Sequence, residues 1–232
     1  MMFRTVALVQ ARMGSSRFPG KMLSSLGSHS VLEWVLIRLS KADLLDDIVV
    51  ATTNLEKDNV LENLAINLGF KVFRGSEGDV LGRFAAAANM HDARSVVRVC
   101  ADNPFIEPLE INRLIENYHR SKCDYAFNHL SRLGSNYADG FGAEILGNDL
   151  LQKLNGSVTQ LNHREHATSY LWDHIDDYNI LAIPAPKELA YPEYRFDIDT
   201  PSDLDYLRKV VEQVVNIKTA ASDILKMAKK IN

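Results

Sequence analysis

Short apolar runs alternate with helical stripes of apolar residues through the first half of the chain. Four runs rich in β-branched residues predict buried strands, at Val6–Val9, Ile48–Ala51, Lys71–Phe73 and Val96–Val99. Between and after them, apolar residues recur with the spacing of a one-sided helix, over 32–39, 61–68, 81–88 and 111–118. Strands that alternate with helices through short connections predict a parallel sheet covered on both faces. The expected fold class is therefore α/β, with a Rossmann-like, doubly wound and mostly parallel sheet.

After Asp124 the alternation of predicted strands and helices becomes less regular. Strands are expected at Phe141–Leu146 and Tyr178–Ile183, helices around Leu150 and Tyr170, and a further short strand at Arg195–Ile198. Thr200 as N-cap and Pro201 at the first helical position predict the start of a helix. No linker or repeat interrupts the chain, so residues 1–232 are expected to form a single domain. An insertion around 128–192 and C-terminal helices over 201–232 would complete it.

The amino-acid composition of the chain limits the classes of protein to which it can belong. The chain has 232 residues, of which 46% are hydrophobic and 24% charged, values typical of a globular protein rather than a disordered one. The net charge of −4 argues against a dedicated nucleic-acid binder, whose surface would be basic. No apolar stretch approaches the ~18 residues of a membrane span, and the first residues do not resemble a signal peptide. Cys100 and Cys123 lack metal-ligand spacing and are expected to be reduced thiols in a cytoplasmic protein.

The segment QARMGSSRFPGK, which begins at Gln10, directly follows the first predicted strand. Ligands of open α/β sheets bind outside the carboxyl ends of the strands. Backbone N–H groups of such a loop can cradle phosphate oxygens, and Arg12, Arg17 and Lys21 can neutralise their charge. The segment is not a P-loop, because Met22 replaces the hydroxyl residue that would hold magnesium. A solvated basic loop is the alternative interpretation.

Two carboxylates are expected at the same edge of the sheet. Asp102 follows the fourth predicted strand and suits a hard cation, although Asp-Asn-Pro is also good turn chemistry. Asp197 and Asp199 lie two residues apart, so they would share one face of a strand. Asp199 could equally favour the start of the helix that follows. A phosphate-binding loop and two carboxylates at strand ends are the fewest groups that magnesium-assisted chemistry on a nucleotide requires.

Four motifs carry a resemblance to a known family, in the same order along residues 3 to 210: VQARMGSSRFPGK from Val9, VVATTN from Val49, VFRGSEGDVLGRF from Val72 and DTPSDL from Asp199. They closely resemble the spore coat polysaccharide biosynthesis protein F family. That family belongs to the cytidylyltransferases, alongside the CMP-KDO and CMP-acylneuraminate synthetases. The resemblance implies the nucleotide-diphospho-sugar transferase type of fold. It also implies a reaction that couples a nucleoside triphosphate, typically CTP, to a sugar and releases pyrophosphate.

The resemblance assigns roles to particular residues. Arg12 and Lys21 would hold the triphosphate and the departing pyrophosphate, and Asp102 and Asp199 would bind Mg²⁺; these four are the expected catalytic residues. The expected nucleotide-binding set is Gln10, Ala11, Arg12, Gly14, Ser15, Lys21, Thr52, Arg83 and Asp102. Ala101 stands where relatives usually carry glycine. Recognition of another base therefore stays open.

The acceptor is expected to bind to the second half of the chain. DGFGAE from Asp139 and the tripeptide Arg164-Glu165-His166 also resemble family segments. Arg164 could pair with an acceptor carboxylate, and Glu144 or His166 could bind hydroxyls, so these residues and Asp139 form the expected acceptor-binding set. A solvated helix start is the alternative for the tripeptide. The isolated histidines are expected at the surface: His91, His119 and His129.

The sequence thus predicts a magnesium-dependent cytidylyltransferase that couples CTP to a sugar or sugar acid for surface polysaccharide or glycan synthesis. The alternatives are another base or a non-sugar acceptor, a nucleotide-binding protein without turnover, and a glycosyltransferase, whose Asp-x-Asp would normally lie in mid-chain. No membrane or nucleic-acid partner is expected. A homodimer is expected because several apolar residues have no obvious place in the sheet layers: Phe141, Ile145, Leu171, Trp172, Ile175, Ile224 and Leu225.

Overall fold

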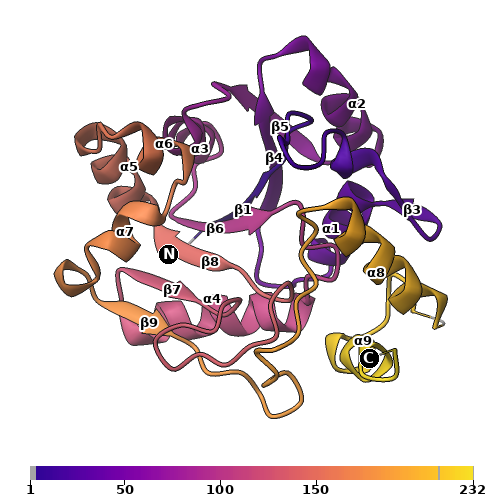
Figure 1. Ribbon diagram of the computed structural model, residues 1–232. Helices are drawn as coiled ribbons and strands as arrows, with labels where there is room; N and C mark the ends of the chain where they lie inside the picture. Colours follow the sequence, from indigo (N-terminus) through magenta and orange to yellow (C-terminus); the bar gives the residue numbers. More distant parts are fainter. Residues whose placement is uncertain (1–3, 214, 232) are drawn as a thin grey trace.

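The computed structural model describes residues 4–213 and 215–231. A seven-stranded sheet of order β5-β4-β1-β6-β8-β7-β9 runs through the centre of the molecule (Figure 1). Its strands are β1 (Thr5–Gln10), β4 (Asp47–Thr53), β5 (Lys71–Gly75), β6 (Ser95–Cys100), β7 (Tyr125–Phe127), β8 (Glu144–Gly147) and β9 (Ile180–Ala182). Only the pairs that β8 makes with β6 and with β7 are antiparallel. The expected mostly parallel α/β fold is confirmed.

Helices cover both faces of the sheet (Figure 1). One face packs against α1 (Val31–Leu39), α2 (Asn59–Asn67) and α4 (Pro108–Ser121), and the other against α3 (Val80–Met90), α5 (Asn148–Ser157) and α7 (Ser169–Asp173). Because side chains alternate along a strand, each strand serves both cores. In β6, Val97 and Val99 face the first group of helices and Val96 the second. Helix α6 (Leu161–Glu165) lies against α3.

A third apolar cluster joins the C-terminal helices to α1 instead of to the sheet. Helices α8 (Pro201–Glu212) and α9 (Ala221–Ala228) lie beside α1 (Figure 1), next to the small hairpin of β2 (Ser25–Leu26) and β3 (His29–Ser30). Trp34 is buried at the centre of this cluster. Its Nε1 donates to the Leu26 carbonyl at 2.7 Å, and its ring meets Phe105 edge-on at 5.4 Å. Helix α8 begins as expected, with Thr200 capping and Pro201 in its first turn.

Five of the seven apolar residues that were expected to cover a dimer surface have places within the chain, whereas Trp172 and Ile175 are half-buried. Buried in its three cores are Phe141, Ile145, Leu171, Ile224 and Leu225. The argument for a dimer from these side chains is therefore wrong, because the third cluster, which the sheet layers do not foretell, buries several of them. The dimer itself stays a prediction.

The remaining differences from the sequence prediction are local. Residues 141–146 form a strand only from Glu144 onward. Residues 195–198 do not form the expected strand, since a single bridge between Asp139 and Arg195 is their only ladder pairing. Strand β7 has no counterpart in the prediction, because three residues are too few to show a period. None of the described helices is long and apolar enough to cross a membrane.

Replacing Trp34 by alanine should destabilise the fold by about 3–5 kcal/mol, because it removes a fully buried ring and leaves the Leu26 carbonyl without its donor. Urea unfolding followed by circular dichroism would measure the loss. Leu109→Ala is the control: Leu109 is 69% exposed, and its replacement should change the free energy of unfolding by no more than about 0.5 kcal/mol. Equal losses in the two variants would contradict the central place of Trp34.

Candidate active site

The loop after β1 is held by a buried carboxylate. Asp58 is fully buried, and its Oδ1 accepts from the backbone N–H of Met13 at 2.7 Å, while Oδ2 accepts from the Thr53 hydroxyl. Near the end of the loop, Gly20 has a φ of 77°, a conformation that favours glycine. Its N–H donates to the Met13 carbonyl at 3.1 Å, which closes the loop. A short 3₁₀ helix, η1 (Lys21–Leu23), begins directly after it.

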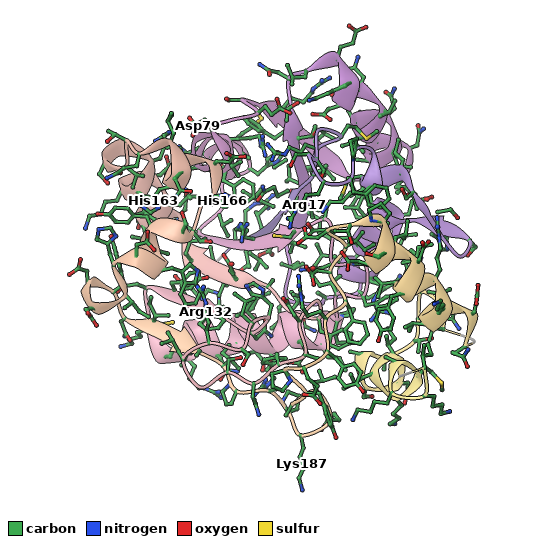
Figure 2. The ribbon with its side chains drawn as sticks, viewed as in Figure 1. Arg17, Asp79, Arg132, His163, His166 and Lys187 are labelled. Atoms are coloured by element: carbon green, nitrogen blue, oxygen red, sulfur yellow. The ribbon has the colours of Figure 1, made fainter. Side chains whose placement is uncertain are left out.

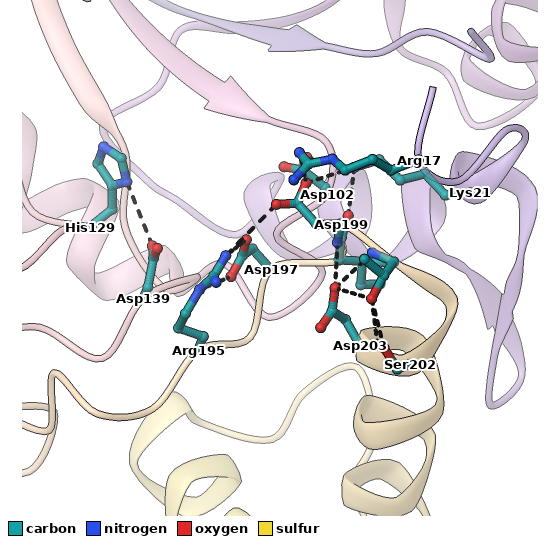
Figure 3. Close-up of polar contacts among 12 residues, drawn as sticks. Arg17, Lys21, Asp102, His129, Asp139, Arg195, Asp197, Asp199, Ser202 and Asp203 are labelled. Atoms are coloured by element: carbon teal, nitrogen blue, oxygen red, sulfur yellow. Dashed lines mark hydrogen bonds and ion pairs between the residues drawn. The ribbon is translucent and has the colours of Figure 1, made fainter. Parts of the chain in front are cut away.

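Lys21 joins three segments of the chain at one atom. Its Nζ donates to Asp102 Oδ2 at 2.8 Å and to the Ile198 carbonyl at 2.5 Å, and lies 3.8 Å from Asp199 Oδ1 (Figure 3). The Lys21 side chain is only 9% exposed. The backbone supports the same approach, because the N–H of Ile198 donates to the Asp102 carbonyl at 2.9 Å. The structure thus brings Asp102, which follows β6, and Asp199, which precedes α8, together around one ammonium group.

Two arginines and a third carboxylate complete this arrangement. Arg17 donates to Asp199 Oδ1 at 2.7 Å. Arg195 binds both oxygens of Asp197, at 3.0 and 2.5 Å, and lies 3.8 Å from Asp199 Oδ2 (Figure 3). Burial raises the pKa of Asp197 although Arg195 opposes the shift, and the nearby Asp139 and Asp102 carboxylates add to it. We call the group of three cations and three carboxylates the Lys21 cluster: Arg17, Lys21, Arg195, Asp102, Asp197 and Asp199.

A cavity of about 250 Å³ opens at the carboxyl ends of β1 and β6. Its lining residues are Gln10, Arg12, Ser15, Ser16, Arg17, Lys21, Met22, Arg98, Cys100, Asp102, His166 and Asp199. The strand order reverses between β1 and β6, which is where open α/β sheets bind their ligands. Figure 2 marks Arg17, on the loop after β1, and His166, at the end of α6, which approach the strand ends from two directions.

Arg98 places a guanidinium in this cavity that the sequence analysis did not single out. It lies opposite Glu144 in the pairing of β6 with β8, and its Nη1 donates to Glu144 Oε1 at 2.9 Å. Its Nη2 donates to Gln10 Oε1 at 3.3 Å, whereas its Nε is buried without a partner. A charged residue inside the apolar run of 96–99 is the signal that could have identified it, because central strands rarely carry an unneeded charge.

His129 extends this charged row away from the cavity. Its Nε2 lies 3.1 Å from Glu144 Oε1 and its Nδ1 3.7 Å from Asp139 Oδ1 (Figure 3). Burial alone would lower the pKa of His129, but Asp139 and Glu144 raise it to about 9, so the ring is charged at neutral pH. Arg98 and His129 in turn hold the pKa of Glu144 far below its usual value despite burial. The expectation that His129 lies at the surface is wrong, because the fold encloses it between two carboxylates.

Some of the site residues predicted from the sequence line the cavity, and others do not. Of the expected nucleotide-binding residues, Gln10, Arg12, Ser15, Lys21 and Asp102 line the cavity, whereas Ala11, Gly14, Thr52 and Arg83 do not. Of the expected acceptor residues, His166 lines it, whereas Asp139, Glu144 and Arg164 do not. Asp199, the remaining expected catalytic residue, lies in the lining. Cys100, also in the lining, and Cys123 are both free thiols.

Arg164 has its donors occupied elsewhere. Its Nη2 donates to Asp79 Oδ2 and to Asn155 Oδ1, both at 2.8 Å, and its Nη1 donates to the Val158 carbonyl at 2.8 Å. Asp79 itself caps α3 through the N–H of Gly82. Arg164 therefore ties α5 and α6 to the start of α3.

Arg83 is nearly fully buried and incompletely paired. It is 2% exposed, and its Nη1 donates to the Ser76 carbonyl at 2.6 Å. Its Nε and Nη2 are buried without a partner. Burial and the neighbouring Arg12 lower the pKa of Arg83 to about 10. The two arginines therefore repel each other, and an anion bound beside Arg12 would relieve that repulsion.

The fold is that of a nucleotidyltransferase. The sequence matches the cytidylyltransferase family over residues 6–224, and the chain belongs to that family. The spore coat polysaccharide biosynthesis protein SpsF of Bacillus subtilis is 31% identical over 210 residues, which cover 89% of this chain and 85% of that protein. The resemblance noted in the sequence is thereby confirmed.

Solved structures of other proteins have the same fold as this chain. A cytidylyltransferase from Leptospira borgpetersenii has a TM-score of 0.90 and 28% identity, with 98% of this chain and 94% of that chain covered. A CMP-2-keto-3-deoxy-manno-octonic acid synthetase, determined in complex with CTP, has the same fold at a TM-score of 0.68. It is 16% identical, and the match covers 91% of this chain and 100% of that one.

Replacing His129 by glutamine should remove a pH dependence of stability. The folded-state pKa of about 9 lies above the unfolded value of ~6.5. His129 therefore stabilises the fold fully below pH ~6.5 and loses this contribution as the pH rises through its folded pKa. We expect the free energy of unfolding of the wild type to fall more steeply between pH ~6.5 and ~9.5 than that of the variant. Urea titrations across this range would measure both slopes, and parallel profiles would contradict the charged state of His129.

Proposed function

We propose that this chain is a magnesium-dependent enzyme that transfers a cytidylyl group from CTP to a hydroxyl group of a sugar or sugar acid, with release of pyrophosphate. The product would serve surface polysaccharide or glycan synthesis. One observation carries the proposal: a cation-rich loop and the carboxylates of Asp102 and Asp199 meet at Lys21, in a cavity where sheets of this kind bind ligands. Membership of the cytidylyltransferase family supports it, as does the CTP bound to a synthetase of the same fold.

The nucleotide would bind at the loop side of the cavity. Arg12, Arg17 and Lys21 line that side together with two serine hydroxyls, and their charges suit a triphosphate. A phosphate beside Arg12 would also stabilise Arg83, whose Nε and Nη2 are buried without a partner. Arg83 would then act through Arg12 and not by lining the cavity.

The two carboxylates fit a magnesium ion. Mg²⁺ prefers oxygen ligands and is commonly held by one or two carboxylates plus the substrate phosphates. Asp102 and Asp199 already converge on a cation, the ammonium of Lys21. No larger group of His, Cys, Asp and Glu side chains suited to a metal occurs among residues 4–213 and 215–231. Magnesium held by Asp102 and Asp199 would supply neutralisation of phosphate charge.

The residues of the chain would position the reactants and offset charge, with no covalent intermediate. The acceptor oxygen attacks the α-phosphorus, and the bond from that phosphorus to the bridging oxygen breaks. Arg12 and Lys21 stabilise the negative charge of the departing pyrophosphate, and the hydroxyl proton passes to solvent. Electrostatic stabilisation of this kind in a partly enclosed cavity requires no nucleophilic side chain.

The acceptor would bind on the side of the cavity formed by Arg98 and His166. Arg98 offers its guanidinium to an anionic or hydroxyl group, and Glu144 would act by holding that guanidinium in place. Asp139 does not line the cavity and instead contacts His129. A role for Arg164 in acceptor binding would require its bonds to Asp79 and Asn155 to break.

The proposal includes a cellular setting. The free Cys100 and Cys123 suit a reducing compartment, so we propose that the enzyme acts in the cytoplasm. A homodimer is proposed on general grounds, because most soluble oligomers are symmetric dimers. Light scattering at micromolar concentration would measure the mass, and the mass of a single chain would contradict the dimer.

The reaction can be tested through pyrophosphate release from each of the four ribonucleoside triphosphates, with and without Mg²⁺, against a panel of acceptors that includes 3-deoxy-manno-octulosonate and neutral sugars. We expect release only with CTP, Mg²⁺ and a suitable acceptor. Asp102→Asn should lower turnover by a factor of about 10²–10³, because the variant loses a carboxylate that would hold the magnesium ion and, with it, the neutralisation of phosphate charge. The control is Lys226→Met, which replaces an exposed residue of α9 paired only with Asp223 and should leave turnover unchanged.

Binding of the nucleotide can be tested without an acceptor. CTP with Mg²⁺, at a hundred times its dissociation constant, should stabilise the wild type by about 2.7 kcal/mol. Arg12→Ala should weaken this stabilisation while leaving the nucleotide-free protein almost as stable, because the pair of Arg12 with Glu165 is largely solvated. An unchanged thermal shift in the variant would remove Arg12 from the nucleotide site.

A further inference from the structure

The ammonium group of Lys21 lies between the two carboxylates that are proposed to hold the metal ion. Its ammonium lies within 3.8 Å of three oxygen atoms, from Asp102, Ile198 and Asp199. Its side chain is 9% exposed, so little water competes for these contacts. A metal ion and an ammonium cannot both lie between the same carboxylates, since they would overlap and repel each other.

The Lys21 cluster is electrically balanced without any ligand, because three cations face three carboxylates. A divalent cation alone would add two positive charges to this balanced site. A triphosphate alone would bring several negative charges close to the carboxylates. Metal and triphosphate together satisfy both kinds of charge in the cluster. The cations would then pair with the phosphates, and the carboxylates would pair with the metal ion.

Lys21 is better suited than Arg17 to hold the carboxylates. The side chain of Arg17 is 65% exposed, and its one ion pair is with Asp199. Lys21 is the sole ion-pair partner of Asp102 in the described part of the chain, and it reaches Asp199 as well. The flexible four-carbon stem of a lysine also allows the ammonium to move without a change in the backbone.

The carboxylates are held together by contacts that do not involve Lys21. The Asp102 carbonyl accepts from Ile198, and the N–H groups of Asp199 and Thr200 donate to Asp203 Oδ2 at 3.0 and 2.7 Å (Figure 3). These bonds anchor the start of α8 next to the end of β6. Removal of the ammonium would therefore leave Asp102 without an ion-pair partner among the described residues, next to Asp199, which keeps only its solvent-exposed arginine partners. Two carboxylates in this arrangement can hold a cation.

We propose that Lys21 is an internal counter-cation that keeps the metal site closed until a nucleoside triphosphate binds. The proposal rests on the proposed function, which places a metal at Asp102 and Asp199. When the triphosphate arrives, the ammonium turns from the carboxylates to the phosphate oxygens, and the vacated position accepts the metal. Metal and nucleotide consequently bind with positive coupling, and each raises the affinity for the other by the same factor.

The test measures metal binding in the absence of nucleotide, with Mn²⁺ as the probe and electron paramagnetic resonance to count the free ion. The variants are Lys21→Met, which keeps the length of the stem but removes the charge, and Lys226→Met as the matched control. We expect Lys21→Met to bind Mn²⁺ roughly 10-fold more tightly than the wild type and the control, within the usual range of coupling. Adding Asp102→Asn to Lys21→Met should abolish the gain.

Equal Mn²⁺ affinity in the wild type and Lys21→Met would overturn the inference, as would a gain that survives Asp102→Asn. If Lys21→Met does not give the circular dichroism spectrum of the wild type, Lys21→Gln, whose amide can still donate to Ile198, takes its place with the same expectation. A separate calorimetric titration of the wild type with CTP and Mn²⁺ tests the proposed function. Absence of binding there contradicts the proposed function, whereas binding there with no gain in Lys21→Met contradicts only the role of Lys21 as counter-cation.

Discussion

The contact of the Lys21 ammonium with Asp102 and with the Ile198 carbonyl is the interaction on which the site depends. It joins residues separated by 81 and 177 positions in the chain, at distances of 2.8 and 2.5 Å. Two structural conditions must hold for it to form. The parallel sheet must set β1 beside β6, so that the segments after both strands meet, and the C-terminal helices must dock against α1, so that residues 197–199 reach the same point.

The docking of the C-terminal helices has its own ionic anchor. Arg38 of α1 is almost fully buried and donates to the carbonyls of Ile106, Ile217 and Thr219, and to Glu107 at 3.2 Å. Glu107 in turn accepts from the N–H of Ala221, where α9 begins. Buried charges cost free energy unless each is paired. Here the bonds to Ile217, Thr219 and Ala221 tie the C-terminal segment to α1 and to the start of α4, while Glu107 pairs with the Arg38 charge. The site thus depends on a second, remote network that contains no residue of the cavity.

Two charged systems built in different ways meet at the cavity, each with some of its residues in the lining. The Lys21 cluster comes from loops, and its side chains retain partial contact with solvent. Arg98 and Glu144 lie opposite each other on β6 and β8, His129 follows the end of β7, and this row is far more enclosed. Loop cations on flexible stems suit a ligand that arrives and leaves, whereas strand residues locked in a pairing register suit a fixed recognition surface. This contrast agrees with a nucleotide side and an acceptor side of one cavity.

The sequence by itself determined the strands and helices of the first half, the cation-rich loop after β1 and the family, because hydrophobic period and motif spacing are local properties of the chain. Only the tertiary structure decided which charges meet. It placed Arg98 in the cavity and enclosed His129. It also paired Arg164 with Asp79, and it left residues 195–198 with a single bridge instead of a strand pairing. An ion pair forms between segments that approach each other in space, and no local period records that approach. The pairing of Lys21 with two carboxylates far along the chain is therefore a property of the packed sheet and its docked C-terminal helices.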